Sequence, residues 1–562
     1  MLVDLMTKQG EELLASRQIP WSVYPRPQMR RESYLNLNGC WDFHVNYENQ
    51  GQIRVPFCPE SKLSGFGVHY DEGSMLQYTR TFTLPEGFHR GRVLLHVGAA
   101  DQRADVFLNG KPVGTHKGGY EAFTMDITDY LCENNHLNIC CFDDLTDQSY
   151  PYGKQTLNRG GMWYTPVSGI WQTVWLESVP ENYIHQLHIE NRGYGVTVSI
   201  VPKLNGWVRI PELGEFPLVD GSVCITPEEP HLWSPEDPYL YDFTVEAGDD
   251  RVESYFAIRD LQIQQVGQWP RLCLNGKPYF FHGLLDQGYW PDGLFTPATP
   301  ECYAEDILAM KKLGFNTLRK HIKVEAEEFY YQCDKLGMIV WQDMVNNDDY
   351  SFLRDTALPT IGIQKLDDRK LHTDPKTRKA FLDGMAATVN QLKNHPSICY
   401  WTIFNEAWGQ FDSDHVYELF RQLDDTRFVD STSGWFRRNN SDVDSRHVYF
   451  RKVKLRGDGK KPLVLSEFGG KTYRAENHVF NPDKAYGYGG CSNLESLQQA
   501  VSDLYMTEIL PCIQDGLCAA IYTQVSDVED EINGLLTYDR KVEKLKPEVM
   551  LPIAEALQDA MK

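Results

Sequence analysis

Short runs of alternating apolar and polar residues recur through the first 265 residues, separated by Gly, Asn and Pro. They include residues 40–45, 78–84, 92–97 and 104–108, and Asn109-Gly110 follows the last of these runs. An alternation of period two predicts strands with one buried face, and Asn-Gly predicts a tight hairpin turn. Strands at this spacing are typical of β-sandwiches and jelly rolls.

This all-β region divides near Val179-Pro180, directly after the apolar-rich run 171–177. A second set of alternating runs, including 195–200 and 241–246, ends near residue 265 and has the length of a small seven-strand sandwich. We therefore predict two β domains, at residues 1–180 and 181–265.

Beyond residue 265 the apolar positions take helical spacings of three and four, in alternation with short apolar runs. Phe381, Met385, Val389 and Leu392 show the helical spacing. The apolar runs that we interpret as strands are 280–285, 317–321, 338–343, 399–406, 428–432, 447–450, 462–467 and 519–525. Eight such βα units predict one (β/α)₈ barrel over residues 266–562.

The composition excludes several classes of partner. Lys and Arg number 55 and Asp and Glu number 78, which gives a net charge of −23. A chain this acidic repels phosphate backbones and anionic lipid surfaces, so we expect no nucleic acid and no membrane as a partner. Hydrophobic residues make up 42% and charged residues 24% of the chain, as in ordinary globular domains.

The 13 cysteines are scattered, and no two of them form a Cys-x-x-Cys pair. This spacing predicts reduced thiols rather than a disulfide framework or a zinc site. The N-terminus carries no apolar run of signal-peptide length, and no run approaches the length of a membrane span, so we expect a cytoplasmic protein. No HExxH motif or phosphate-binding glycine loop occurs, and we expect neither a metal nor a cofactor.

The barrel prediction selects a few acids from the many in the chain, because the active site of such a barrel lies at the carboxyl ends of its strands. Five acids end or follow predicted strands: Asp286, Asp343, Glu406, Glu467 and Asp527. Acids at a barrel rim also cap helices and pair with arginine, so each of them has a structural reading as well.

Glu406 and Glu467 stand out by their context. Glu406 ends an apolar strand and follows Asn405, and Glu467 ends another apolar strand and is soon followed by two glycines. Two glutamates that reach across one barrel mouth could flank a glycosidic bond. At a separation of about 5 Å, one could act as nucleophile and the other as acid and then base. Two independent rim acids are the alternative.

Three stretches carry a family resemblance: Ser-Gly-Ile-Trp-Gln-Thr-Val-Trp-Leu at 168–176, Phe-Asn-Glu with Trp408 at 404–408, and Leu-Ser-Glu-Phe-Gly at 465–469. In these the chain resembles glycoside hydrolase family 2, the group of β-galactosidases, β-glucuronidases and β-mannosidases. The resemblance implies a multidomain fold. Its parts are an N-terminal sugar-binding-like β jelly roll at 1–180, an immunoglobulin-like β-sandwich at 181–265 and a catalytic (β/α)₈ TIM barrel at 266–562.

The resemblance also implies a retaining, exo-acting glycoside hydrolase that works by double displacement through a covalent glycosyl-enzyme. Glu406 would be the acid/base, Glu467 the nucleophile, and Asn405 the partner of the sugar 2-hydroxyl. Tyr449 matches a tyrosine that orients the nucleophile, and His321 matches a histidine at the barrel mouth.

The other expected binding residues rest on weaker signals. Arg319 could hold the nucleophile's carboxylate by two hydrogen bonds. Asp343 at the end of the third strand is expected to bind substrate, and Trp408 could stack on a sugar. Core packing is the alternative for Trp408, as for Trp290, Trp341 and Trp435, and a structural role is the alternative for His321.

Departures from the family pattern bear on the sugar. Glucuronidases of this family carry an Asn-x-Lys near the end of the barrel that binds the sugar carboxylate. This chain reads Glu531-Ile532-Asn533 there, so the lysine is missing and an acid stands nearby. On the eighth strand, where relatives often offer a tryptophan, it reads Ile-Tyr-Thr-Gln at 521–524. These departures favour a neutral sugar.

The sequence thus predicts a glycosidase acting on a terminal neutral sugar of a glycoside or oligosaccharide, with a β-D-galactoside as the first candidate. A β-glucuronidase, a β-mannosidase and an α-L-arabinofuranosidase stay open on the same machinery. A non-catalytic carbohydrate-binding protein is the alternative from another class. A homo-oligomer also stays open, because the β-sandwich domains of such enzymes often pack against a second subunit.

Overall fold

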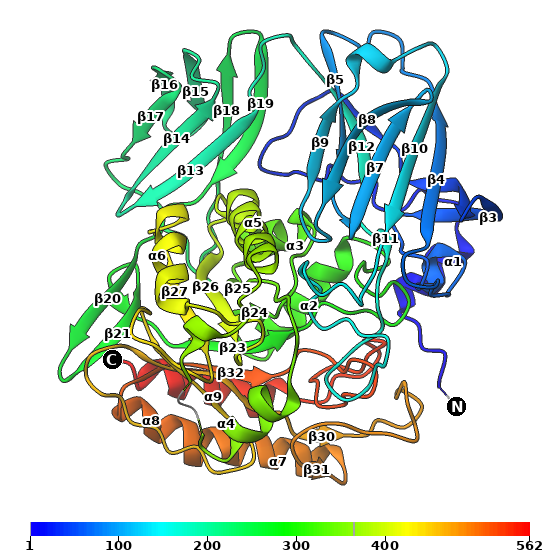
Figure 1. The fold of residues 1–562 in the computed structure, drawn as a ribbon. Helices are drawn as coiled ribbons and strands as arrows, with labels where there is room; N and C mark the ends of the chain where they lie inside the picture. Colours follow the sequence, from blue (N-terminus) through cyan, green and yellow to red (C-terminus); the bar gives the residue numbers. More distant parts are fainter. Residues whose placement is uncertain (1, 364–365) are drawn as a thin grey trace.

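The computed structural model describes residues 2–363 and 366–562. Two β domains lie on one side of a mixed α/β domain (Figure 1). Within the described residues, none of the helices combines the length and the apolar character needed to cross a membrane.

The first β domain is a sandwich of two sheets, and a short helix, α1 (Lys8–Ala15), precedes its strands in the chain. Its larger sheet contains, in order, β3 (Glu48–Val55), β2 (Gly39–Val45), β4 (Met75–Phe82), β10 (Asn135–Phe142), β7 (Arg103–Leu108) and β8 (Lys111–Lys117). The smaller sheet contains β1 (Tyr34–Asn36), β12 (Val174–Val179), β5 (Arg92–Val97) and β9 (Phe123–Asp126). Buried aliphatic and aromatic side chains of both sheets form one core between them, as the period-two pattern predicts.

The second β domain is a smaller sandwich with its own core. One sheet contains β13 (Gln186–Arg192), β14 (Gly195–Val201) and β17 (Ser222–Ile225), and the other contains β16 (Gly214–Leu218), β15 (Gly206–Ile210), β18 (Tyr241–Ala247) and β19 (Asp250–Phe256). A separate sheet of β20 (Leu261–Val266), β21 (Trp269–Leu274) and β22 (Lys277–Pro278) follows, so the division predicted at residue 265 falls inside this sheet.

The C-terminal domain is a nearly closed barrel of eight parallel strands, which confirms the predicted (β/α)₈ architecture. In chain order the strands are β23 (Phe281–Asp286), β24 (Thr317–Lys320), β25 (Ile339–Asp343), β26 (Ile398–Asn405), β27 (Phe428–Ser433), β28 (Asp444–Val448), β29 (Leu463–Gly469) and β32 (Leu517–Thr523). Neighbouring strands are hydrogen-bonded in the order β27, β26, β25, β24, β23, β32, β29 and β28.

Helices cover the outside of the barrel, chiefly α2 (Glu301–Lys312), α3 (Glu327–Leu336), α5 (Pro375–Leu392), α6 (Ser413–Leu423), α7 (Leu494–Leu504), α8 (Leu510–Gln514) and α9 (Pro547–Asp559). The predicted helical spacing in α5 is confirmed, since Phe381, Met385, Val389 and Leu392 are all buried.

The sixth strand differs from its prediction at 447–450, since β28 spans Asp444–Val448 and Tyr449 lies just beyond its end. The apolar pattern failed here because this part of the barrel interior is polar. The hydroxyl of Ser445 lies 2.6 Å from that of Ser466 on β29, and Ser466 in turn accepts a hydrogen bond of 3.0 Å from Ser433 on β27. Buried serines that satisfy one another leave no hydrophobic signal in the sequence.

The connection between β10 and β11 (Gly169–Ile170) leaves the first β domain and lies across the barrel mouth, and Figure 1 shows it as a cyan segment beside the red loop that follows β32. The backbone N–H of Tyr152 donates to the carbonyl of Asn346, at 3.1 Å. The backbone N–H of Thr165 donates to Glu529 Oε1, at 2.9 Å. The N-terminal domain therefore forms one wall of the barrel mouth.

Candidate active site

Glu406 and Glu467 meet at the carboxyl ends of β26 and β29. One oxygen of each carboxylate and the Nδ1 of His447 all lie within 4.8 Å of one another. The Glu406 side chain is 12% exposed and that of Glu467 6% exposed, so both are largely shielded from water. Glu406 and Ala407 have φ of +48° and +67°, a left-handed conformation that is rare for residues with a side chain and is common at functional sites.

Arg319 on β24 holds one side of Glu467. Its Nη1 donates to Glu467 Oε1 at 3.1 Å, its Nε donates to Asp343 Oδ1 at 3.0 Å, and its Nη2 donates to Asn405 Oδ1 at 2.8 Å. Burial alone would lower the pKa of Arg319, but the carboxylates of Asp343 and Glu467 raise it above its ordinary value. The guanidinium is therefore a fixed cation that joins four strands of the barrel.

Tyr449 holds the other oxygen of Glu467. Its hydroxyl donates to Glu467 Oε2 at 2.6 Å, and its ring stacks on Tyr488 with centroids 3.9 Å apart. Burial, and then the charge of Glu467, raise the pKa of the Tyr449 phenol well above its ordinary value, so the phenol stays protonated and donates. Both carboxylate oxygens of Glu467 thus accept hydrogen bonds, which fixes the carboxylate in position.

His447 contacts Glu406 directly, and sequence reasoning missed this role. Its Nδ1 lies 2.7 Å from Glu406 Oε1 and 3.6 Å from Glu467 Oε2, and its Nε2 lies 2.9 Å from the Ser433 hydroxyl. In the tautomer with a proton on Nδ1, the imidazole donates to Glu406. A histidine at the carboxyl end of a barrel strand was the available signal, but the misplaced sixth strand hid it.

Asn405 and His321 complete the polar floor of the site. The amide oxygen of Asn405 is used by Arg319, and within the described residues its buried Nδ2 has no hydrogen-bond partner. His321 Nδ1 lies 2.7 Å from Asp343 Oδ2. Burial, and then the ammonium of Lys154, lower the pKa of His321 to about 4, so its imidazole is neutral at pH 7 and donates to Asp343.

Trp408 lies in a cluster of aromatic rings. Its ring stacks on Trp163 at 5.2 Å between centroids and meets Tyr350 edge-on at 5.4 Å. Trp163 comes from the N-terminal segment that lies across the barrel mouth, which sequence reasoning did not connect to the site. Trp341, by contrast, is fully buried and stacks on Tyr400 at 3.8 Å, so it is a core residue.

The remaining strand-end acids pair with lysines away from the glutamate pair. Asp286 Oδ2 accepts from Lys320 at 2.7 Å, and Asp527 accepts from Lys544 at 2.6 Å. The structure therefore brings together the expected site residues Arg319, His321, Asp343, Asn405, Glu406, Trp408, Tyr449 and Glu467, and it leaves Asp286 and Asp527 in ion pairs of their own.

Among residues 2–363 and 366–562, two groups of side chains have the composition of metal ligands. One is Glu406, His447 and Glu467, whose atoms are already engaged in the hydrogen bonds described above. The other is Asp348, Asp349 and His372, in the loops that follow β25.

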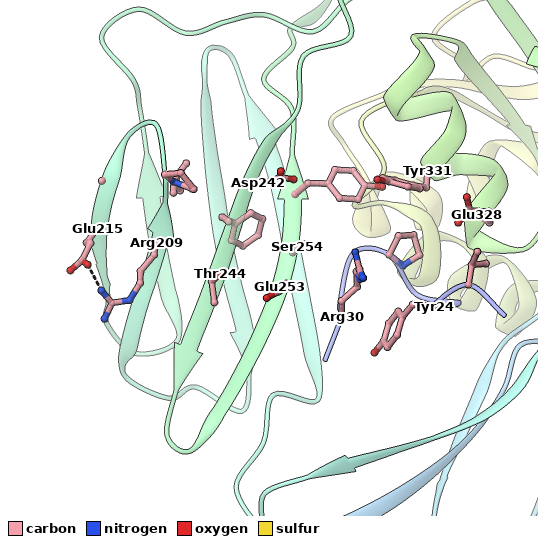
Figure 2. Close-up of a pocket in the computed structure, with 17 residues that line it drawn as sticks. Tyr24, Arg30, Arg209, Glu215, Asp242, Thr244, Glu253, Ser254, Glu328 and Tyr331 are labelled. Carbon is pink, nitrogen blue, oxygen red and sulfur yellow. Dashed lines mark hydrogen bonds and ion pairs between the residues drawn. The ribbon is translucent and has the colours of Figure 1, made fainter. Parts of the chain in front are cut away.

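Cavities do not by themselves mark the site. One cavity of about 780 Å³ lies between the second β domain and the segment around Tyr24 and Arg30, with Tyr331 of α3 on its far side (Figure 2). Its described lining residues include none of the barrel-mouth side chains. Another cavity, of about 440 Å³, is lined by Tyr449 and Tyr488, but neither Glu406 nor Glu467 is among its described lining residues.

Comparison with known families gives a consistent result along the chain. The model described as "Glycosyl hydrolases family 2, TIM barrel domain" matches residues 268–488. "Glycosyl hydrolase 2 galactose-binding domain-like" matches residues 30–156, and "Glycosyl hydrolases family 2" matches residues 210–259.

Individual relatives are distant. A β-galactosidase of Thermoanaerobacter pseudethanolicus is 22% identical, and the match covers 80% of this chain and 63% of that protein. This chain thus spans less than two thirds of that relative's length. A β-glucuronidase of Bacteroides fragilis is 23% identical, and the match covers 81% of this chain and 68% of that protein. The solved structure of a β-D-glucuronidase from Dictyoglomus thermophilum shares the fold, with a TM-score of 0.71 at 19% identity. The match covers 95% of this chain and 98% of that one.

The neutral state of His321 has a consequence for acid stability. An unfolded chain binds a proton on histidine near pH 6.5, whereas folded His321 does so only near pH 4. The stability that neutral His321 contributes is therefore complete above about pH 6.5 and is lost as the pH falls to about 4, a total of about 3 kcal/mol. Between pH 7 and pH 4.5, the free energy of unfolding should therefore fall less for His321→Gln than for the wild type. Denaturant unfolding at both pH values measures this difference. An NMR titration of His321 with a midpoint near 6.5 would contradict this expectation.

Proposed function

We propose that this chain, which belongs to glycoside hydrolase family 2, is a retaining, exo-acting glycosidase that works through a covalent glycosyl-enzyme intermediate. The observation that carries the proposal is the distance between the two glutamates. Retaining enzymes place their carboxyl groups about 5 Å apart, whereas inverting enzymes leave about 6.5 to 9.5 Å for a water molecule. One oxygen of Glu406 lies within 4.8 Å of one oxygen of Glu467, which leaves less room than an inverting pair needs and supports the retaining geometry.

Glu467 is the proposed nucleophile. In the first step one of its oxygens bonds to the anomeric carbon while the glycosidic bond breaks and its electron pair leaves with the aglycone oxygen. The two hydrogen bonds from Arg319 and Tyr449 support this role, because they hold the carboxylate in one orientation.

Glu406 is the proposed acid and base. It gives its proton to the departing oxygen in the first step, and in the second it takes a proton from the water that attacks the anomeric carbon and releases Glu467. His447 supports this exchange, because its Nδ1 contacts Glu406 Oε1 and can stabilise the carboxylate after the proton has left.

The remaining residues are proposed to bind the sugar. The Nδ2 of Asn405, which has no partner in the described part of the chain, is a donor for the sugar 2-hydroxyl. This interaction strengthens as positive charge develops at the anomeric carbon. Trp408 and His321 are proposed to contact the ring and its hydroxyls. Asp343 acts indirectly, since it fixes both Arg319 and His321.

For the sugar itself we propose a neutral one, with a terminal β-D-galactose as the first candidate. The buried carboxylate of Glu531, where a uronate would need a cation, supports a neutral sugar. The relatives named above are a β-galactosidase and β-glucuronidases. A panel of 4-nitrophenyl glycosides that includes galactoside, glucuronide, mannoside and arabinofuranoside separates these candidates.

Glu467→Gln should lower kcat on the glycoside that the wild type cleaves by on the order of 10³-fold or more, because an amide cannot form the glycosyl ester. The measurement is steady-state release of nitrophenol. Glu476→Gln is the matched control, since Glu476 is an exposed acid of the loop that follows β29, and it should keep wild-type activity. Unchanged activity of Glu467→Gln would overturn the assignment.

Glu406→Ala should slow turnover most for substrates with poor leaving groups, because these need protonation as the bond breaks. We expect losses of about 10² to 10⁴-fold in kcat/KM with alkyl or phenyl aglycones, and much smaller losses with 2,4-dinitrophenyl aglycones. The same loss with all leaving groups would show that Glu406 is not the acid.

A further inference from the structure

Lys154 is a buried lysine at the barrel mouth. It lies in the N-terminal segment between β10 and β11 and is 7% exposed. Its Nζ stands 5.6 Å from the ring centroids of both Tyr164 and Trp408. Within the described residues, this Nζ makes no hydrogen bond and no ion pair, although it lies near the two proposed catalytic glutamates.

A buried ammonium without a hydrogen-bond acceptor is energetically costly. Burial lowers the pKa of Lys154, and the charges of Glu531, Glu467 and Glu406 raise it only in part. The two aromatic faces attract the cation but accept none of its three protons in an ordinary hydrogen bond. Lys154 therefore has donors available for a ligand oxygen.

Glu531 is the complementary acceptor. It is 2% exposed, its Oε1 accepts from Asn533 Nδ2 at 3.1 Å, and its Oε2 accepts from the hydroxyl of Tyr164. Each carboxylate oxygen can accept a second hydrogen bond. Asn533 is held in turn by Gln524 Nε2 at 3.0 Å, so the carboxylate is fixed before any ligand arrives.

Lys154 and Glu531 attract each other across the mouth but do not meet in an ion pair. Tyr164 touches both of them, since its ring faces Lys154 and its hydroxyl donates to Glu531. The two charged groups thus present a donor and an acceptor beside the same tyrosine. A sugar hydroxyl, which both accepts and donates, satisfies the two at once.

We propose that Lys154 and Glu531 form a hydroxyl-binding pair that selects a neutral terminal sugar, with the lysine supplied by the N-terminal domain. The proposal rests on the glycosidase function proposed above and names the residues that set its specificity.

The charges at the mouth argue against a uronate as the ligand of Lys154. Four carboxylates, those of Asp343, Glu406, Glu467 and Glu531, lie around the two basic side chains Arg319 and Lys154. With Glu406 protonated as the acid, the remaining carboxylates still outnumber these cations. A sugar carboxylate adds a further negative charge to this site, whereas a hydroxyl adds none.

The test combines changes in the enzyme with changes in the substrate. The substrates are the 4-nitrophenyl glycoside that the wild type cleaves and its monodeoxy analogues. Lys154→Met should lower kcat/KM on the parent glycoside by about 10-fold or more, because a charged hydrogen bond is lost. For one analogue, the kcat/KM of the wild type should fall by a similar factor relative to the parent glycoside. The kcat/KM of Lys154→Met should fall little further on that analogue, so that the free-energy effects of the two changes are not additive.

Two further variants separate this role from a structural one. Glu531→Gln should show the same lack of additivity with the same deoxy analogue. Lys376→Met is the matched control, because Lys376 bonds Asp147 at 3.4 Å on the exposed side of the same interdomain contact, and it should leave kcat/KM unchanged. The proposal would be overturned if the loss of kcat/KM caused by Lys154→Met were the same on every deoxy analogue as on the parent glycoside. It would also be overturned if the wild type preferred the glucuronide or galacturonide and Lys154→Met abolished that preference.

A binding measurement keeps this inference separate from the proposed function. Calorimetry of the Glu467→Gln enzyme with D-galactose, D-glucose and their uronic acids requires no turnover. Binding of a neutral sugar that weakens about 10-fold or more on addition of Lys154→Met supports the pair. Tighter binding of a uronic acid, or binding that Lys154→Met leaves unchanged, overturns it. Failure of the proposed function appears instead as a wild type that cleaves no glycoside.

Discussion

The site depends on one guanidinium group. Arg319 on β24 reaches Asp343 on β25, Asn405 on β26 and Glu467 on β29, and also donates to the carbonyl of Ser466. A planar fork with fixed donor directions determines where each of these acceptors lies. A full positive charge, buried inside a barrel, would be prohibitively costly without these carboxylates, and the carboxylates would repel one another without it. Arg319 thus joins the proposed nucleophile Glu467, the amide of Asn405 and the carboxylate that supports His321 in one electrostatic unit.

A second constraint comes from outside the barrel. The segment between β10 and β11 contributes Lys154, Trp163 and Tyr164, and each of them contacts a barrel residue or a partner of one. The proposed catalytic pair belongs to the barrel alone, whereas one wall of the mouth belongs to the N-terminal domain. In such an arrangement, substitutions in the N-terminal segment can change which sugar the site accepts without disturbing Glu406 and Glu467.

Much of this structure could be predicted from the sequence, because the signals were local. The change from period-two to helical spacing predicts the barrel, and an apolar run that ends in an acid marks Glu406 and Glu467 as strand-end residues. Tyr449 was also identified, although β28 begins three residues earlier than predicted. The buried serines of that strand carry no apolar pattern, and the same error hid the contact of His447 with Glu406.

The rest could not be predicted, because it depends on contacts between distant parts of the chain. Lys154 lies in a loop of a β domain, and its sequence context resembles that of any surface lysine. Only the tertiary fold brings it over Trp408, far along the chain, and close to Glu531. The acid at position 531 was evident from the sequence, but its hydrogen-bonded network with Tyr164 and Asn533 was not.

The central claim is that Glu467 forms a covalent bond to the sugar. A 2,4-dinitrophenyl 2-deoxy-2-fluoro glycoside of the cleaved sugar tests this most directly, because the fluorine slows both steps while the good leaving group lets the first one proceed. After incubation, mass spectrometry of the digested protein should find the sugar on the peptide that contains Glu467. A label on another residue, or turnover of ordinary substrates with inversion at the anomeric carbon, would contradict the account.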